Sequence, residues 1–396
     1  MQGCEIIIPD WFWMVFLFAI GCCVGSFLNV VIYRLPRDKS LVAPPSSCPA
    51  CGKHIRFYDN IPLVSWLLLG RKCRYCKAPI SPRYFIIELL TGLVFVGIFV
   101  LYFRSGLRGG IPTFLAGGWF LYLLSIILLS ALIAASAIDL EMWIIPLSIC
   151  WFATAAGLLA SLLAPLVIHP ATIRHYFLVP TTADLILVNQ TTIASLSAGA
   201  VIGLGVSILL LTTGLIKRSY DFSHLQNSPE NPQQKGEDEF KDRVEMLKEI
   251  VFLLPIIACA LAADWVVSRY PALHQWWLAF SQRPVIAGLM GSLAGYFVGC
   301  GIVWATRILG TLGFGREAMG LGDVHLMGAA GAVIGPLFVV IAFFIAPFFG
   351  LAWAGLQMFF RKTRQIPYGP FLSLGILAVM ILHDRIMAYL SVVFYR

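Results

Sequence analysis

The amino-acid sequence predicts an all-α polytopic membrane protein with about ten spanning helices and one small domain in an extramembrane loop. Three observations predict this class: the composition, the length of the apolar runs and two Cys-x-x-Cys pairs in one polar loop. Hydrophobic residues make up 59% of the 396 residues and charged residues 12%, about half the roughly 25% of soluble domains. So few charged side chains cannot cover that much apolar surface in water, and we expect the excess to face lipid.

Nine apolar runs are close to the ~20 residues that a helix needs to cross a bilayer. These runs lack the period-2 alternation of a membrane barrel, which leaves α-helices as the way to cross. A tenth, shorter run at 324–335 precedes Pro336 and predicts a short helix that turns back. The nine predicted spans are 11–33, 84–103, 113–138, 144–166, 191–216, 249–267, 284–306, 337–360 and 370–393.

Basic residues gather in one loop. Between residues 34 and 83 there are ten Lys and Arg, opposed only by Asp38 and Asp59, so the positive-inside rule predicts that this loop is cytoplasmic. The loop at 361–369, which also carries three basic residues, falls on the same side. Ten crossings put both termini outside. The net charge of +8 is therefore explained by basic residues in cytoplasmic loops of a protein that lies in a lipid membrane. We expect no nucleic-acid partner.

The same basic loop holds four cysteines in the pattern Cys-x2-Cys, 21 residues, Cys-x2-Cys: Cys48, Cys51, Cys73 and Cys76. Four thiolates at such spacing can surround one tetrahedral Zn²⁺. A loop of this size has too little core to fold alone, and a structural metal would stabilise it. Two disulfides are disfavoured by a reducing cytoplasm, and a redox iron site would use similar ligands. We predict a small cytoplasmic zinc-ribbon domain over residues 35–83, with iron and disulfides as alternatives.

Two carboxylates stand out because they lie at the ends of apolar runs. Asp139 ends one predicted helix and Asp323 starts another, and the topology places both on the cytoplasmic side. An ionisable group at such a position is costly to desolvate and is often functional. The alternative for Asp323 is a plain helix N-cap. Gly320 and Gly322 favour a functional role, since they let backbone or substrate approach Asp323 closely.

Two carboxylates close together share a proton. The ionised one can take a proton from water while the protonated one polarises a peptide carbonyl, so the pair predicts peptide hydrolysis. The sequence offers neither a G-x-S-x-G nucleophile elbow nor an H-E-x-x-H zinc site as a rival catalyst. His325, two residues after Asp323, is interpreted as a residue of the helix turn rather than as a base.

Six blocks of sequence, in order, resemble the type IV prepilin peptidases, the bacterial aspartic proteases with a G-x-G-D motif. Together they cover about residues 15–165 and 284–393. The blocks are Gly25–Pro36, the four-cysteine ribbon, Ser81–Tyr84 with Glu88–Thr91, Ile138-Asp139 with Ile145-Pro146, Gly315–Asp323, and Ile366–Phe371.

This resemblance implies a catalytic pair, Asp139 and Asp323, with supporting motif residues Gly320, Gly322, Glu88, Pro367 and Gly369. It implies an aspartic endopeptidase of the bacterial inner membrane that cuts the basic leader from prepilins or pseudopilins of type IV pilus or type II secretion systems, at the cytoplasmic face. Members with the cysteine ribbon often also methylate the new N-terminus with S-adenosylmethionine. No Gly-rich methyltransferase fingerprint is present in the sequence, so that second activity is implied by the resemblance alone.

The two aspartates are separated by more residues than is usual in the family. We interpret 167–283 as an insertion of two helices and a polar linker at 218–248, which ends in a charged stretch that we expect to be helical. We expect this insertion to be dispensable for the chemistry, because two added crossings preserve the sidedness of the later helices. The predicted divisions are a first helix (1–34), the ribbon (35–83), helices carrying Asp139 (84–166), the insertion (167–283) and helices carrying Asp323 (284–396).

Other classes of protein remain open at this stage. A transporter also holds intramembrane aspartates and Gly-rich helices, but would show flux and no cleavage. A non-catalytic assembly factor would bind pilins uncut, and a redox protein would use the cysteines to carry electrons.

Overall fold

The computed structural model describes residues 9–107, 111, 113–168, 190–216, 234–360 and 367–394. Across these ranges the chain is helical apart from turns and two isolated β-bridges. Nine of the described helices are long and apolar enough to cross a membrane, and a shorter apolar helix covers Leu321–Ile334. The predicted fold class, including the short tenth helix, is confirmed.

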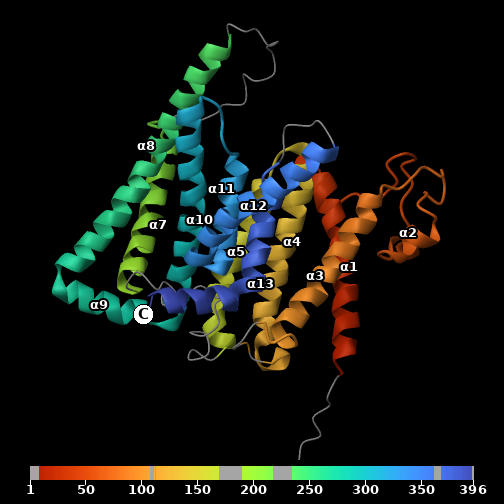
Figure 1. The fold of residues 1–396 in the computed structure, drawn as a ribbon, viewed down its shortest axis with the longest axis horizontal. Coiled ribbons are helices and arrows are strands. Elements are labelled where there is room, and N and C mark those ends of the chain that lie inside the picture. The colour runs from red at the N-terminus through yellow and green to blue at the C-terminus, as the bar shows by residue number, and fades with distance from the viewer. Residues whose placement is uncertain are drawn as a thin grey trace, which may run out of the picture. The chain divides into compact units, whose positions relative to one another are not determined.

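The helices follow the predicted runs to within a few residues over most of the chain. In order they are α1 (Asp10–Arg34), η1 (Leu35–Arg37), η2 (Phe57–Asn60), α2 (Val64–Leu68), α3 (Pro82–Phe103), η3 (Phe114–Ala116), α4 (Gly118–Met142), α5 (Leu147–Val167), α7 (Gln190–Thr212), α8 (Gln234–Arg269), α9 (Pro271–Ser281), α10 (Pro284–Phe314), α11 (Leu321–Ile334), α12 (Pro336–Phe360) and α13 (Gly369–Phe394) (Figure 1).

The chain divides into two compact units. The first comprises Met1–Ile149 and Gly350–Arg396, and so contains α1, α3, α4 and α13. The second comprises Cys150–Phe349 and contains α7 to α11 with most of α5. Asp139 belongs to the first unit and Asp323 to the second.

In the first unit, α1 and α3 pack side by side (Figure 1). Small residues allow the close approach: a Cβ on Gly25 of α1 would lie 2.7 Å from the Cα of Glu88 on α3. The buried Asn29 amide adds a polar link, since its Nδ2 donates to the backbone carbonyl of Tyr84 at 3.1 Å. These contacts explain why the Gly25–Asn29 and Tyr84–Glu88 stretches carry their particular residues.

In the second unit, α7 packs along α8 and α10 packs along α11. The α10–α11 pair is tied by Ser292, whose hydroxyl donates to the Ala332 carbonyl at 2.7 Å. Side chains of α11 are almost wholly buried from Val324 to Ile334. The short helix that begins beside Asp323 is therefore held on several sides, which suits a helix that has to fix a functional side chain.

The structure differs from the sequence prediction at three connections. The connection at 268–283, between two of the predicted spans, contains α9, an apolar helix with exposed Trp276 that begins at Pro271. The charged stretch at the end of the 218–248 linker is helical, as expected, but it is continuous with the next span and forms one helix with it, α8. Helix α10 continues to Phe314, beyond the predicted end at 306. Charged residues extend only α8 in this way; α9 is too short to be predicted as a span, and α10 continues past Arg307, where the predicted run ended. The first part of the linker and the basic residues at 361–364 lie outside the described residues.

Candidate active site and metal centre

The four loop cysteines come together on two turns that repeat the same hydrogen bonds. In the first turn, Cys48 N–H donates to the Lys53 carbonyl and Gly52 N–H donates back to the Cys48 carbonyl. In the second, Cys73 and Lys77 make the corresponding bonds with Ala78 and Cys73. Gly52 and Lys77 both have positive φ, +69° and +59°, a conformation that Gly adopts freely and Lys at some cost.

The sulfur geometry fits a tetrahedral metal. All four Sγ atoms lie within 4.8 Å of one another, and those of Cys48 and Cys76 are 3.8 Å apart. Zinc–sulfur bonds of about 2.3 Å in a tetrahedron separate the sulfurs by about 3.8 Å. A disulfide would need sulfurs about 2.05 Å apart, and all four cysteines are free thiols. The cluster can therefore hold a metal ion, and Zn²⁺ and iron remain candidates because both accept four thiolates.

The electrostatics of the cluster favour a thiolate at one ligand. Backbone N–H groups of Cys76 and Tyr75 hydrogen-bond the Cys73 sulfur and lower the pKa of its thiol to about 6. The thiolate is the form of cysteine that binds metals. Because these N–H groups belong to the turn itself, the fold prepares this ligand before a metal arrives.

Glu88, implied as a supporting residue by the motif, lies on α3 and is buried. Its Oε2 accepts a hydrogen bond of 2.8 Å from the backbone N–H of Leu63, a non-glycine residue with φ of +61°. Leu63 precedes α2 between the two cysteine turns. Glu88 thus anchors the ribbon loop to the membrane helices.

Asp139 lies in the last turn of α4 and is 7% exposed. Its Oδ2 accepts a hydrogen bond of 3.0 Å from the backbone N–H of Gly369, the first residue of α13. A Cβ on Gly369 would come within 2.7 Å of that oxygen and 3.0 Å of Ile145 Cδ1, so this position has no room for a side chain. Pro367 lies two residues earlier and is half-buried. The structure brings together Asp139 and Gly369, two motif residues separated by 230 positions.

Asp323 lies in the first turn of α11 and is 8% exposed. Gly320 is the N-cap residue, and the Asp323 N–H donates to its carbonyl at 3.2 Å. Gly320 makes no side-chain cap, and a Cβ there would lie 3.4 Å from Asp323 Oδ2. Gly322 is half-buried beside it. His325 stacks its ring on Trp151, with centroids 6.1 Å apart, in agreement with a packing residue.

One polar cluster was missed by the sequence predictions. Arg307 on α10 and Glu249 on α8 form an ion pair in which both side chains are almost fully buried. The available signal was a pair of opposite charges at the ends of two apolar runs, Glu249 at the start of one and Arg307 just after the other. Such charges are typical of helix-end residues in water, and the sequence does not show that the two helices lie side by side.

Taken together, these features define a multi-pass helical membrane protein with a four-cysteine loop cluster and buried carboxylates at helix ends. Residues 19–102 match the family profile described as the Bacterial Peptidase A24 N-terminal domain, and residues 250–355 match that of the Type IV leader peptidase family. Over these two regions the chain is similar to the N-terminal and the catalytic domains of the peptidase A24, or type IV prepilin leader peptidase, family.

Curated relatives agree with this family. The chain is 46% identical over 149 residues to a "Prepilin leader peptidase/N-methyltransferase" of Myxococcus xanthus, a match that covers 37% of this chain and 39% of that protein. It is 41% identical over 140 residues to the "Type 4 prepilin-like proteins leader peptide-processing enzyme" of Escherichia coli, covering 31% and 46%. A Klebsiella pneumoniae "Prepilin leader peptidase/N-methyltransferase" is 41% identical over 162 residues, covering 38% and 63%.

The matched regions thus span less than two thirds of each of these relatives. No solved structure matches the chain. The catalytic-domain match begins at residue 250, inside the range 167–283 that the sequence suggests is an insertion. The domain boundaries and the site residues stay predictions.

Proposed function

We propose that this protein is an aspartic endopeptidase of the bacterial inner membrane that removes the basic leader from prepilins or pseudopilins at the cytoplasmic face. Asp139 and Asp323 carry the reaction. In the proposed mechanism one carboxylate takes a proton from a water molecule, and the other, protonated, polarises the scissile carbonyl. No covalent bond to the enzyme forms.

The observation that carries this proposal is the environment of Asp139. A buried carboxylate is costly unless its oxygens are hydrogen-bonded, and Asp139 accepts a bond from the backbone N–H of Gly369, where a Cβ would press on the same oxygen. A carboxylate needed only for solubility at a helix end would point to water. The Gly369 bond orients Oδ2 and leaves Oδ1 to interact with a water or a partner carboxyl.

Asp323 supports the proposal from the other unit. It follows Gly320 and Gly322 in the G-x-G-D pattern, is almost buried, and starts a helix packed on nearly every side. A carboxylate in the first turn of a helix is favoured by the positive end of the helix dipole. A rigid helix at this point fixes the direction of the side chain.

A second activity, N-methylation of the processed pilin with S-adenosylmethionine as methyl donor, is proposed because the Myxococcus and Klebsiella relatives are named as N-methyltransferases. The four-cysteine loop is proposed as a structural zinc ribbon that serves either activity by folding the loop. The ribbon and the membrane helices meet through Glu88 and Leu63.

The test is incubation of the purified protein with a prepilin that bears a basic leader, followed by mass measurement. We expect loss of the leader mass, and with S-adenosylmethionine a further gain of one methyl group. An uncut prepilin that still binds the protein would support a non-catalytic assembly factor instead. Cleavage without the gain of a methyl group would support the peptidase activity and contradict the methyltransferase activity.

A further inference from the structure

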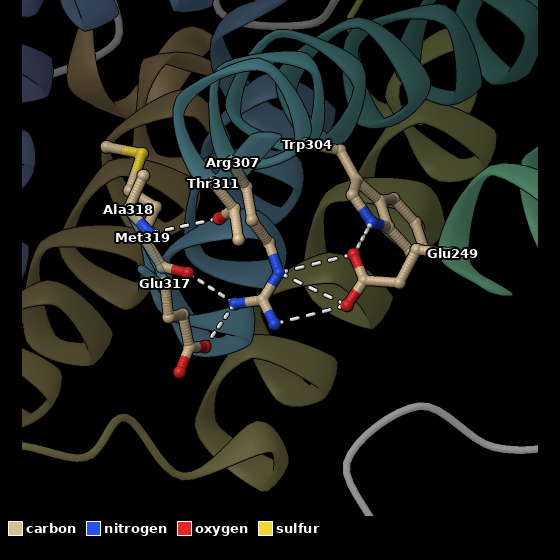
Figure 2. Close-up of polar contacts among 7 residues, drawn as sticks. All are labelled: Glu249, Trp304, Arg307, Thr311, Glu317, Ala318 and Met319. Carbon is tan, nitrogen blue, oxygen red and sulfur yellow. Dashed lines mark hydrogen bonds and ion pairs between the residues drawn. The ribbon is translucent and has the colours of Figure 1, made fainter. Parts of the chain in front are cut away.

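Arg307 is a buried cation whose contacts point in two directions. It lies on α10 with 2% of its side chain exposed, and Figure 2 shows its guanidinium between a helix and a loop. On one side Nε and Nη2 donate to the carboxylate of Glu249 on α8, at 3.1–3.2 Å. On the other side Nη1 donates to Glu317 Oε1 at 2.5 Å and to the backbone carbonyl of Met319.

Glu249 is prepared for this role. Its carboxylate is 4% exposed and also accepts a hydrogen bond of 2.7 Å from the indole Nε1 of Trp304, one turn before Arg307 on α10. A buried ion pair persists only when further hydrogen bonds satisfy its charged atoms. Here Trp304 and Arg307 together contact both oxygens of Glu249, so the carboxylate fixes the direction of the guanidinium.

The loop that Arg307 holds leads directly to Asp323. Residues 315–320 connect α10 to α11, and three in succession are tied to α10: Glu317 and Met319 by Arg307, and Ala318 through its N–H, which donates to Thr311 Oγ1 at 3.1 Å. Gly320 comes next and caps α11, and Asp323 lies in the first turn of α11. Asp323 follows Met319 by only four residues, so the contacts that fix Met319 also restrict the backbone position of Asp323.

We propose that Glu249 and Arg307 are positioning residues that fix the Glu317–Met319 segment and, through it, the place of the Asp323 carboxyl. The effect of this positioning on prepilin cleavage rests on the function proposed above for Asp323. The proposal also gives Glu249 of α8 a role in positioning Asp323, although residues 167–283 look like an insertion by sequence.

The arginine side chain suits this task in a way that lysine does not. Arg presents five N–H donors in a planar fork, and here it uses three nitrogens for two carboxylates and one carbonyl. Lys keeps the charge but presents a single nitrogen on a flexible stem. An Arg307→Lys variant can still pair with Glu249, yet it cannot hold Glu249 and the loop in the same geometry.

The first measurement is steady-state prepilin cleavage by Arg307→Lys and by Glu317→Gln, the second of which changes the half-exposed end of the cluster and carries little risk to folding. A small misplacement of a catalytic group costs up to about 10²-fold in rate, so we expect kcat to fall about 10²-fold for Arg307→Lys and about tenfold for Glu317→Gln, with KM little changed. The matched control is Glu245→Gln, one turn earlier on α8, where the carboxylate pairs with Lys248. It should behave like the parent.

The second measurement is independent of activity. Arg316 is exposed in the held loop, so trypsin cleavage after Arg316, followed by mass spectrometry, reports how often the loop opens. We expect cleavage there to be about tenfold faster in Arg307→Lys and Glu317→Gln than in the parent and in Glu245→Gln. If the parent protein does not cut prepilin, the peptidase function proposed for Asp323 is wrong. The trypsin cleavage rates would still test whether Arg307 and Glu317 hold the loop.

Parent-like kcat and parent-like trypsin rates in both variants would overturn the proposal. So would a fall in kcat with unchanged trypsin cleavage after Arg316, because the effect on activity would then not pass through the loop. The proposal would also be overturned if the variants gave less folded protein but a normal kcat per folded molecule, because the ion pair would then serve only stability.

Discussion

The Asp139 carboxylate lies where two helix ends of opposite polarity meet. It is in the last turn of α4, where free carbonyls disfavour a negative charge, and beside the first N–H of α13, where a negative charge is favoured. Pro370, the second residue of α13, has no N–H to offer, so the Gly369 N–H is the available donor at that end. The hydrogen bond from Gly369 to Asp139 therefore accounts for both the glycine at 369 and the proline at 370.

Gly369→Ala should damage the site directly. The new Cβ would meet Asp139 Oδ2 and Ile145 at distances that real Cβ atoms avoid, and overpacking of this kind costs about 1–3 kcal/mol. We expect a lower thermal unfolding temperature and prepilin cleavage lowered about tenfold or more. The control is Gly97→Ala on α3, where a Cβ meets nothing within 4 Å; equal behaviour of the two variants would contradict this account of Gly369.

At the scale of the elements, the ribbon consists of two turns that differ mainly in the residue with positive φ. Each turn supplies two sulfurs, and neither has a hydrophobic core of its own. A metal ion shared by the four sulfurs, as proposed, would therefore stabilise the loop. The Asp59–Arg74 pair adds to this, since two guanidinium nitrogens lie 2.5–2.7 Å from the Asp59 oxygens.

The double variant Cys48→Ser with Cys73→Ser should lose a bound metal that the parent holds at about one Zn²⁺ per chain. Elemental analysis of freshly purified protein measures this, and limited proteolysis between residues 40 and 80 should show an unfolded loop. Cys23→Ser, on the exposed side of α1, serves as the control. Iron in place of zinc, or a metal-free parent, would contradict the zinc assignment.

Sequence alone predicted the helices well where apolar runs have clear ends, and less well where polar residues continue a helix. The length of an apolar run indicates a membrane span, but it does not detect α9, which is shorter than a span, nor does it show that the charged helix at the start of α8 is continuous with the span that follows. The cysteine cluster was predictable because its spacing is local. The Asp139–Gly369 and Glu249–Arg307 contacts were not, because each depends on which helices pack together.

At the scale of the whole molecule, the segment 167–283 divides into parts with different expected roles. Glu249 of α8 contacts Arg307, which in turn contacts the loop before Asp323. We therefore expect the linker that precedes α8, rather than the whole segment, to be dispensable for cleavage. That linker lies outside the described residues, and its Ser, Asn, Pro and Gln content is typical of a solvated connection.

Deletion of residues 222–232 leaves α8 intact and should keep prepilin cleavage within about threefold of the parent, because changes of loop length cost little free energy. Cleavage and membrane insertion are measured together. A deletion variant that inserts normally but no longer cleaves would show that the linker contributes to the site or to substrate docking.

The central claim is that Asp139 and Asp323 act as one catalytic pair. The most direct measurement is leader removal by Asp139→Asn and by Asp323→Asn, each followed by the mass of the pilin product, with Asp264→Asn as the control. Asp264 is a carboxylate of α8 that accepts a hydrogen bond of 2.6 Å from Ser195, and its amide variant should cleave like the parent. An amide can neither accept nor share the proton, so the account predicts that both site variants insert normally and lose cleavage by at least about 10³-fold. Substantial turnover by either Asp139→Asn or Asp323→Asn would contradict it.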